Sequence, residues 1–316
     1  MAEMRAVRFH EYGPASGLTL ESVDRPEPRD SEVLVRVHAA GVNPIDWKFR
    51  AGYLQEFMPL DLPYTPGIDV AGTVESVGAD VRDLAAGDAV FGRGSGTYAE
   101  FALAPSGSLA VKPKRISFEE AATLGVGGVT AWSGLFDTAR LEAGQRLLVH
   151  GGAGGVGSLA VQLGHWTGAH VIVTASDANA GYVRSLGADE VIDYRATPFE
   201  DVVGDLDVVF DTVGGEVTER SWDVLRPDGI LVVIAGMPEP EKAKAHGVRT
   251  AGVQAPEPIA PILHQLAQLA ESGELRPQVG QVFSLSEAAA SHAASETGHG
   301  RGRIVLQVGD SATSAA

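Results

Sequence analysis

The stretch LLVHGGAGGVGSLAVQLG, residues 147–164, contains six glycines where an apolar strand gives way to a helix. Gly152, Gly154 and Gly157 form the pattern G-x-G-x-x-G. There the first glycine permits a tight turn, the second lets a pyrophosphate approach the backbone, and the third lets helix and strand pack closely. Such turns also join strands to helices for purely structural reasons, but the flanking elements favour dinucleotide binding. The residues expected to hold the pyrophosphate are Gly152, Ala153, Gly154, Gly155, Val156 and Gly157.

Strands and helices alternate from about residue 117 onward. This pattern implies right-handed crossovers and a parallel sheet that is buried on both faces. We therefore predict a Rossmann-like, doubly wound domain over residues 117–277. Its expected strands are 146–151, 170–176, 190–193, 207–215 and 230–236.

Residues 1–116 contain short, valine-rich strands bounded by Gly, Pro and Asp. This pattern is typical of a mostly antiparallel β domain, here interrupted by one helical turn in NPIDWKFRAG, residues 43–52. The last section, 278–316, reads strand, helix, strand and is expected to return to the first domain. The predicted fold is thus an α/β protein, with domain 117–277 inserted into a β domain made of 1–116 and 278–316.

The composition limits the class of partner. The 316 residues are enough for two domains, and the net charge is −17. That charge disfavours nucleic acid and anionic membranes and favours a small-molecule substrate. The chain has no cysteine, which is compatible with a reducing cytosol. Because no signal-peptide-like or long apolar segment is found, we expect a cytoplasmic protein, and we expect no function for the polar tail 309–316.

The end of the second Rossmann strand indicates which coenzyme is used. An acidic side chain there would hold the ribose 2′-hydroxyl group, whereas this strand ends at Ser176, which leaves room for a 2′-phosphate. NADPH is therefore favoured over NADH. Asp177 follows directly and weakens this interpretation unless it caps the next helix. Arg184 is the next basic residue and is the candidate to bind the phosphate.

Eight sequence blocks occur in a matching order along nearly the whole chain, and on them it resembles the zinc-independent quinone oxidoreductase branch of the medium-chain dehydrogenase/reductase superfamily. The resemblance implies a GroES-like β domain joined to a Rossmann domain, and a homodimer. It also implies NADPH-dependent hydride transfer to quinones or to the double bond of α,β-unsaturated carbonyls. The blocks are GVNPIDWKFRAG (41–52), PGIDVAGTVESVG (66–78), GDAVFG (87–92), GGVTAW (127–132), GGAGGVG (151–157), LGADEVIDY (186–194), FDTVGG (210–215) and GRGRIVL (300–306).

No zinc is expected. The zinc alcohol dehydrogenase branch has a Cys and a Gly-His-Glu motif in the regions where this chain has Asn43 and Asp69, and catalytic zinc of that type needs thiolate and imidazole ligands. Without a Lewis acid, simple ketones are poor substrates. Conjugated acceptors need only one or two hydrogen-bond donors for the oxygen that becomes negative.

The resemblance assigns three catalytic residues to the segment after the third expected strand. Asn43 would contact the substrate or the nicotinamide, Lys48 the nicotinamide ribose or the developing oxyanion, and Tyr53 the substrate as wall or proton donor. The competing interpretation is that Asp46 and Lys48 form an ordinary surface ion pair and that Tyr53 only packs.

Further cofactor contacts follow from the family pattern and from the carboxyl ends of the parallel strands. Thr130 would contact the nicotinamide, unless its hydroxyl only bonds its own helix, and Tyr194 would pack beside the 2′-phosphate. The remaining candidates are Val213, Ala235, Gly236, Arg301 and Arg303. For Arg301 and Arg303, an equally weighted alternative is an exposed arginine at a strand end that contacts no cofactor.

Two alternative functions stay open on the sequence. One is an enoyl-thioester or 2-alkenal reductase of the same fold. The other is an NADPH-binding sensor protein with little turnover, because the branch depends on no indispensable acid or base whose absence could be noticed.

Overall fold

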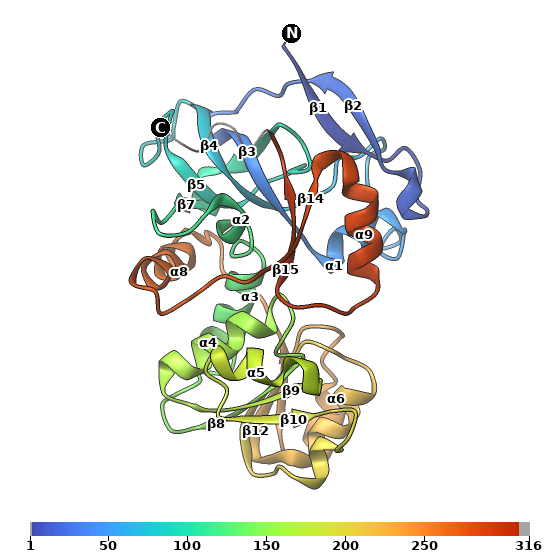
Figure 1. Ribbon diagram of the computed structural model, residues 1–316, viewed down its shortest axis with the longest axis vertical. Helices are drawn as coiled ribbons and strands as arrows, with labels where there is room; N and C mark the ends of the chain where they lie inside the picture. The colour runs from blue at the N-terminus through green and yellow to red at the C-terminus, as the bar shows by residue number, and fades with distance from the viewer. Residues whose placement is uncertain (1, 310–316) are drawn as a thin grey trace. The chain divides into compact units, whose positions relative to one another are not determined.

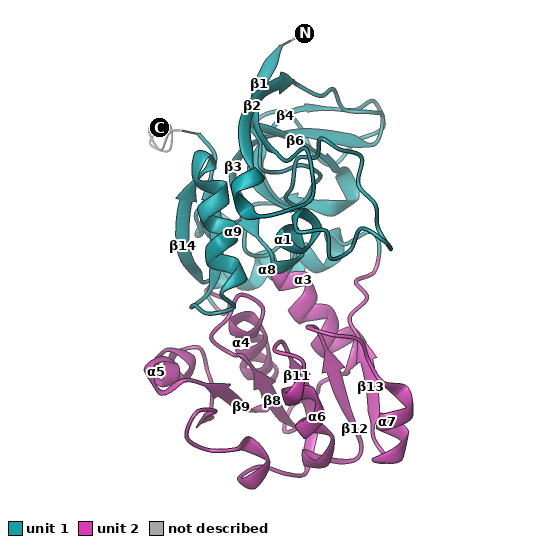
Figure 2. Ribbon diagram, turned by 90° about the vertical axis from the view of Figure 1, so that its right-hand side faces the viewer, with its two compact units in different colours: residues 1–126, 257–273, 277–316 teal, residues 127–256, 274–276 magenta. Residues whose placement is uncertain are grey.

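The computed structural model describes residues 2–309, so Met1 and nearly all of the polar tail, 310–316, lie outside the described residues. The chain forms two compact units (Figure 2). Unit 1 comprises Met1–Val126, Glu257–Gly273 and Pro277–Ala316, and unit 2 comprises Gly127–Pro256 and Glu274–Arg276.

The division differs from the predicted boundaries in two places. Residues 117–126 group with unit 1 because helix α2 (Phe118–Ala121) packs on strands of that unit and the Val126 N–H binds the buried Asp69 carboxylate. Helix α8 (Ala260–Ser272) also belongs to unit 1, where it packs against β7 (Leu109–Val111).

Unit 1 is built on a seven-stranded sheet in the order β14-β15-β3-β4-β5-β7, with β6 paired to β3 (Figure 1). All its pairs are antiparallel except β14 with β15. Because β15 pairs with β3, the last section of the chain returns to the first domain as expected. The strands besides β7 are β3 (Glu32–Val42), β4 (Asp69–Val77), β5 (Ala89–Arg93), β6 (Phe101–Pro105), β14 (Val279–Ser284) and β15 (Arg303–Gln307).

Two helices position the residues that matter for function in unit 1. Helix α1 (Pro44–Arg50) begins directly after β3, and α9 (Ala288–Glu296) packs on α1 and β15. The core beneath them is aliphatic, with Val33, Val35 and Val37 of β3 fully or almost fully buried. Burying such side chains contributes about 1.5–3 kcal/mol each.

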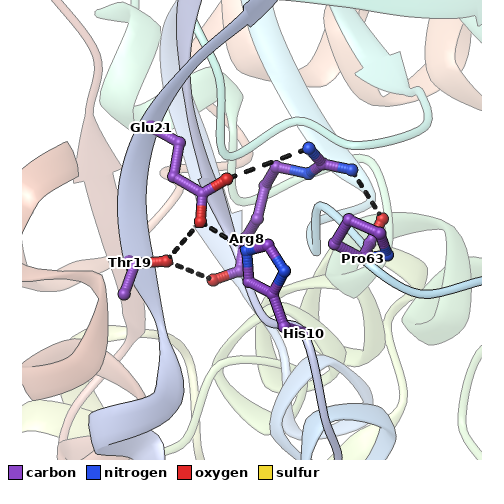
Figure 3. Close-up of polar contacts among 5 residues, drawn as sticks. All are labelled: Arg8, His10, Thr19, Glu21 and Pro63. Atoms are coloured by element: carbon purple, nitrogen blue, oxygen red, sulfur yellow. Dashed lines mark hydrogen bonds and ion pairs between the residues drawn. The ribbon is translucent and has the colours of Figure 1, made fainter.

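A two-stranded antiparallel ribbon, β1 (Glu3–Arg8) with β2 (Thr19–Asp24), is held together by polar side chains, and its Arg8 also reaches the loop after α1 (Figure 3). Glu21 accepts hydrogen bonds from the Thr19 hydroxyl at 2.7 Å and pairs with His10 at 2.6 Å. These bonds lower the pKa of Glu21. Arg8 lies 3.8 Å from Glu21 and donates to the Pro63 carbonyl at 2.9 Å. The loop after α1 is therefore anchored at its far end.

Unit 2 contains a six-stranded, fully parallel sheet in the order β10-β9-β8-β11-β12-β13. Strand order reverses between β8 and β11, and ligands of open α/β sheets bind beyond the carboxyl ends of the strands at such a point. The strands are β8 (Arg146–His150), β9 (His170–Ala175), β10 (Glu190–Asp193), β11 (Leu206–Asp211), β12 (Leu225–Val233) and β13 (Arg249–Gly252).

The helices of unit 2 are short, and α4 is the one that follows the glycine-rich turn (Figure 2). Gly168 caps its C-terminus, and the φ of +85° there suits a residue without a side chain. Across residues 2–309 no helix is long and apolar enough to cross a membrane. The helices are α3 (Gly127–Trp132), which continues into a π-helical turn (Ser133–Thr138), α4 (Gly157–Thr167), α5 (Asp177–Ser185), α6 (Glu216–Ser221) and α7 (Pro240–Ala245).

Candidate active site

The glycine-rich turn lies between β8 and α4, as predicted. Its glycines differ in whether a side chain would fit at their positions. A Cβ on Gly152 would lie 2.2 Å from Val173, and one on Gly157 would lie 2.3 Å from the Gly151 carbonyl oxygen. Close packing therefore requires a glycine at both positions. A Cβ on Gly154 would meet nothing closer than 3.4 Å, so the chain itself does not require glycine there. The space that it leaves open lies at the start of α4, where the positive end of the helix dipole favours a pyrophosphate.

The residues expected at the adenosine end come together at one edge of the sheet. Parallel pairing sets Asp193 opposite Ala175, so Tyr194 and Ser176 leave their strands side by side. Ser176, which is 9% exposed, occupies the N-cap position of α5. The alternative that Asp177 caps this helix is therefore wrong: Asp177 is its first residue, and its carboxylate still counts against NADPH.

Two arginines compete for the role of phosphate ligand beside Ser176. Arg184 lies in the last turn of α5, roughly 12 Å along the helix axis from Ser176 at 1.5 Å per residue. Arg195, which the sequence analysis missed, directly follows Tyr194, and its guanidinium lies 5.6 Å from the centre of the Tyr194 ring. The signal for Arg195 was its place immediately after the end of β10.

The loops after β11 and β12 lie beside the glycine-rich turn at the same sheet edge. The Asp211 carboxylate accepts from the backbone N–H groups of Val213 at 2.9 Å and Gly214 at 3.0 Å, which fixes the first loop. Val213 is 52% exposed, and Ala235 and Gly236 are exposed after β12. The structure thus places these three predicted contacts at the carboxyl ends of parallel strands, and their role stays a prediction.

Asn43 lies in the interior of unit 1, only 1% exposed, at the centre of a charged cluster. Its backbone N–H donates to Asp46 at 2.8 Å and its side-chain amide donates to Asp69 at 2.9 Å. Its side-chain oxygen accepts from Arg303 at 2.7 Å. One asparagine thus joins β3, α1, β4 and β15.

Burial dominates the electrostatics of this cluster. It raises the pKa of Asp46 to about 7, and the charge of Asp69 adds to that shift. It also raises the pKa of Asp69, against the opposing charge of Arg303, and lowers the pKa of Arg303. The alternative of an exposed strand-end arginine is wrong for Arg303, which is 4% exposed, and its cofactor contact stays a prediction.

The cluster extends to residues that the sequence did not indicate. The Tyr98 hydroxyl donates to Asp46 at 3.1 Å, and His292 Nε2 lies 3.3 Å from the same hydroxyl. Burial lowers the pKa of His292 to about 3. Arg50, also buried, pairs with Glu296. These residues are far apart in the sequence and form no motif, so only the fold reveals them.

The other catalytic candidates lie on the outer side of α1 and in the following loop. Lys48 Nζ lies 5.7 Å from the Trp47 ring centre, and Tyr53, 70% exposed, packs edge-on against the same ring. A surface ion pair between Asp46 and Lys48 is excluded, because Asp46 is 2% exposed and bonded to Asn43 and Tyr98.

Two further cofactor candidates have simpler surroundings. Thr130 is half-buried in α3, and Arg301 is exposed just before β15. Neither position decides whether the residue contacts a cofactor, so both assignments stay predictions.

Known proteins resemble this chain over nearly its full length. Two family models match, the alcohol dehydrogenase GroES-like domain over residues 29–114 and the zinc-binding dehydrogenase model over residues 186–306. The NADPH-dependent alkenal/one oxidoreductase of Arabidopsis thaliana is 38% identical, covering 96% of this chain and 79% of its own. The quinone oxidoreductase of Mus musculus is 36% identical, covering 96% and 97%. The quinone oxidoreductase structure from Coxiella burnetii superposes with a TM-score of 0.88 at 35% identity, covering 98% and 100%.

The chain belongs to the quinone oxidoreductase branch of the medium-chain dehydrogenase/reductase superfamily. It is an oxidoreductase with a GroES-like unit and a Rossmann unit, and it uses a nicotinamide cofactor. The fold and family predicted from the sequence are therefore confirmed.

The contrast between Gly154 and Gly157 gives a matched pair of substitutions. We expect Gly157→Ala to lower the free energy of unfolding by about 1–3 kcal/mol, since its methyl group overpacks against a carbonyl. Gly154→Ala should leave stability within about 1 kcal/mol of wild type but weaken NADPH binding at least about tenfold, because the methyl group fills the open space. Urea unfolding and fluorescence titration measure the two effects. Equal NADPH affinity in Gly154→Ala and wild type would contradict the assignment.

The raised pKa of Asp46 predicts a pH-dependent effect of Asp46→Asn, which keeps an acceptor for both hydrogen bonds. Because the folded state binds this proton more tightly, the stability that Asp46 contributes is present below about pH 4 and is lost toward pH 7. The variant should therefore gain stability relative to wild type over this range, by at most about 1.4 kcal/mol per pH unit. A difference in unfolding free energy that does not change with pH would show that burial does not keep Asp46 protonated.

Proposed function

We propose that this oxidoreductase takes hydride from NADPH and delivers it to quinones or to α,β-unsaturated carbonyl compounds. The observation that carries the proposal is the open space at Gly154, which the chain's own packing does not require. The names of the relatives support the two acceptor classes.

The bound nicotinamide would supply the hydride, and the protein would bind and orient the reactants. The residues that would hold the pyrophosphate are on the glycine-rich turn, with Val213, Ala235 and Gly236 beside it. Lys48 and Tyr53 offer an ammonium and a hydroxyl group that can stabilise negative charge on an acceptor oxygen. Asn43, fixed by three hydrogen bonds, would hold the start of α1 and with it the position of Lys48.

We propose that the reaction uses no zinc. The support is the complete lack of cysteine in the sequence, since catalytic sites of the zinc branch use thiolate ligands. Conjugated acceptors suit such an enzyme because hydrogen-bond donors suffice for the enolate or quinol oxygen that forms. Activity that survives exhaustive dialysis against a chelator is the expected result, and loss of activity restored by Zn²⁺ would contradict it.

The choice of NADPH over NADH rests on the edge formed by Ser176, Tyr194 and Arg195. A small hydroxyl side chain leaves room for a 2′-phosphate, and a guanidinium held over a tyrosine ring can pair with it. We expect Arg195→Gln to weaken NADPH binding about tenfold, the loss of one charge-assisted contact, with little change for NADH.

Two variants complete this test. Ser176→Asp should shift the preference toward NADH, because the carboxylate repels a phosphate and binds a ribose hydroxyl. Arg184→Gln decides between the arginines: if it weakens NADPH binding and Arg195→Gln does not, then Arg184 binds the phosphate and our assignment of Arg195 is wrong. Titrations with both coenzymes give the affinities.

The acceptor class is tested with NADPH and four compounds: 1,4-benzoquinone, 9,10-phenanthrenequinone, an acrolein-type enal and crotonyl thioester. We expect stopped-flow oxidation of NADPH with the quinones or the enal. Turnover with the thioester alone would favour the enoyl-thioester reductase. Tight NADPH binding without turnover of any of the four would favour the sensor protein and contradict both enzymes.

We also propose a homodimer located in the cytoplasm. The family resemblance supports the dimer, and the lack of cysteine supports a reducing compartment. Relatives named as chloroplastic and mitochondrial make cell fractionation the necessary test of location. Light scattering after gel filtration tests the dimer, and a monomer mass would contradict it.

A further inference from the structure

His150, the last residue of β8, is 1% exposed and lies between two hydroxyl groups. Its Nδ1 lies 3.0 Å from the Thr174 hydroxyl on β9, and its Nε2 lies 3.1 Å from the Ser221 hydroxyl at the end of α6. The Gly151 N–H, where the glycine-rich turn begins, donates to the same Thr174 hydroxyl at 3.3 Å. A continuous row of hydrogen bonds thus connects α6 with the turn.

The hydrogen bond that Ser221 makes within α6 determines which group is the donor in each of these hydrogen bonds. Ser221 donates its only hydroxyl proton to the Val217 carbonyl at 2.6 Å, so it must accept from His150 Nε2. Nδ1 then carries no proton and accepts a hydrogen bond from the Thr174 hydroxyl group. The Thr174 oxygen is left as the acceptor of the Gly151 N–H.

The imidazole stays neutral in this position. Burial lowers the pKa of His150 to about 4, more than the nearby Asp211 and Glu200 carboxylates raise it, and Arg220 adds to the lowering. A neutral ring has one donor and one acceptor, which is what the two hydroxyl groups require.

The orientation of Gly151 in turn determines the rest of the turn. Gly151 has a φ of +69°, and glycine adopts positive and negative φ about equally readily, so the backbone alone does not select this conformation. Its carbonyl accepts the Gly154 N–H at 3.0 Å and is the group against which Gly157 packs. Holding the Gly151 N–H therefore sets the position of Gly154 and of the start of α4.

We propose that His150 is a positioning residue for the cofactor, which orients the pyrophosphate-binding turn through the Thr174 hydroxyl. The inference rests on the proposed binding of NADPH in this turn. It assigns to a buried histidine a role that is exerted through Thr174.

The tautomer of His150 tests the row of hydrogen bonds in the cofactor-free wild-type protein. ¹⁵N NMR of labelled histidine, with the His150 signals assigned by their loss in His150→Gln, should show a neutral ring protonated at Nε2. A ring protonated at Nδ1, or a rapid average of the two forms, would overturn the proposal.

The effect on the cofactor is tested with NADPH titrations of Thr174→Val and Thr174→Ser. Thr174→Val removes the hydroxyl and should raise the Kd for NADPH about tenfold, since the Gly151 N–H and Nδ1 lose their partner. Thr174→Ser should restore wild-type affinity within about twofold, because it keeps the hydroxyl. The matched control is Thr250→Val, which removes another strand hydroxyl bond, to the Leu231 carbonyl, and should bind NADPH like wild type.

The outcomes separate the two proposals. Wild-type protein that does not bind NADPH contradicts the proposed function and this inference together. Wild-type protein that binds NADPH, with equal affinity in Thr174→Val, overturns the inference alone.

Ser221→Ala replaces Thr174→Val if circular dichroism shows that Thr174→Val does not fold. In Ser221→Ala, His150 should change to the Nδ1-protonated form and NADPH binding should weaken. An unchanged tautomer and an unchanged Kd would overturn the proposal.

Discussion

A Cβ on Gly157 would lie 2.3 Å from the Gly151 carbonyl oxygen, and this close approach determines where α4 begins. The helix can start so near the end of β8 only because no side chain stands between them. The positive end of the helix dipole then lies beside Gly154, where packing leaves space open. The parallel register of β9 with β10 places Ser176 and Tyr194 at the same sheet edge. One helix–strand contact and one strand register thus place the candidate cofactor-binding residues of unit 2 at one edge of the sheet.

Unit 1 depends on a different constraint, the burial of charge. Asp46, Asp69 and Arg303 are each at most 4% exposed, and Asn43 bonds to all three. Buried charges are costly unless they are paired and hydrogen-bonded, and removing one partner of such a set is strongly destabilising. The cluster therefore fixes the end of β3 and the start of α1, the segment that presents Lys48 and Tyr53. This segment is held by polar side chains that never reach the surface.

The sequence predicted features that depend on local spacing and missed those that depend on tertiary convergence. The glycine pattern predicted the turn because its residues are neighbours in the chain. The family resemblance implied that Tyr194 lies beside the 2′-phosphate, and the parallel pairing of β9 with β10 accounts for its proximity to Ser176. Nothing local indicated that Tyr98, His292 and Arg303 would converge on Asn43 and Asp46, since they lie in the loop between β5 and β6, on α9 and on β15. Unit 1 extends past residue 116 to Val126, whose N–H binds Asp69, nearly sixty residues earlier in the chain.

Hydrogen–deuterium exchange with and without NADPH tests the central claim, that the cofactor lies along the glycine-rich edge of the unit 2 sheet, most directly. Saturating NADPH should slow exchange in the segments 151–158, 174–178 and 193–196, because these form the turn, the end of β9 and the end of β10. Protection in the first segment alone would place the pyrophosphate but not the adenosine phosphate. Tight NADPH binding with no protection in any of the three segments would contradict the account.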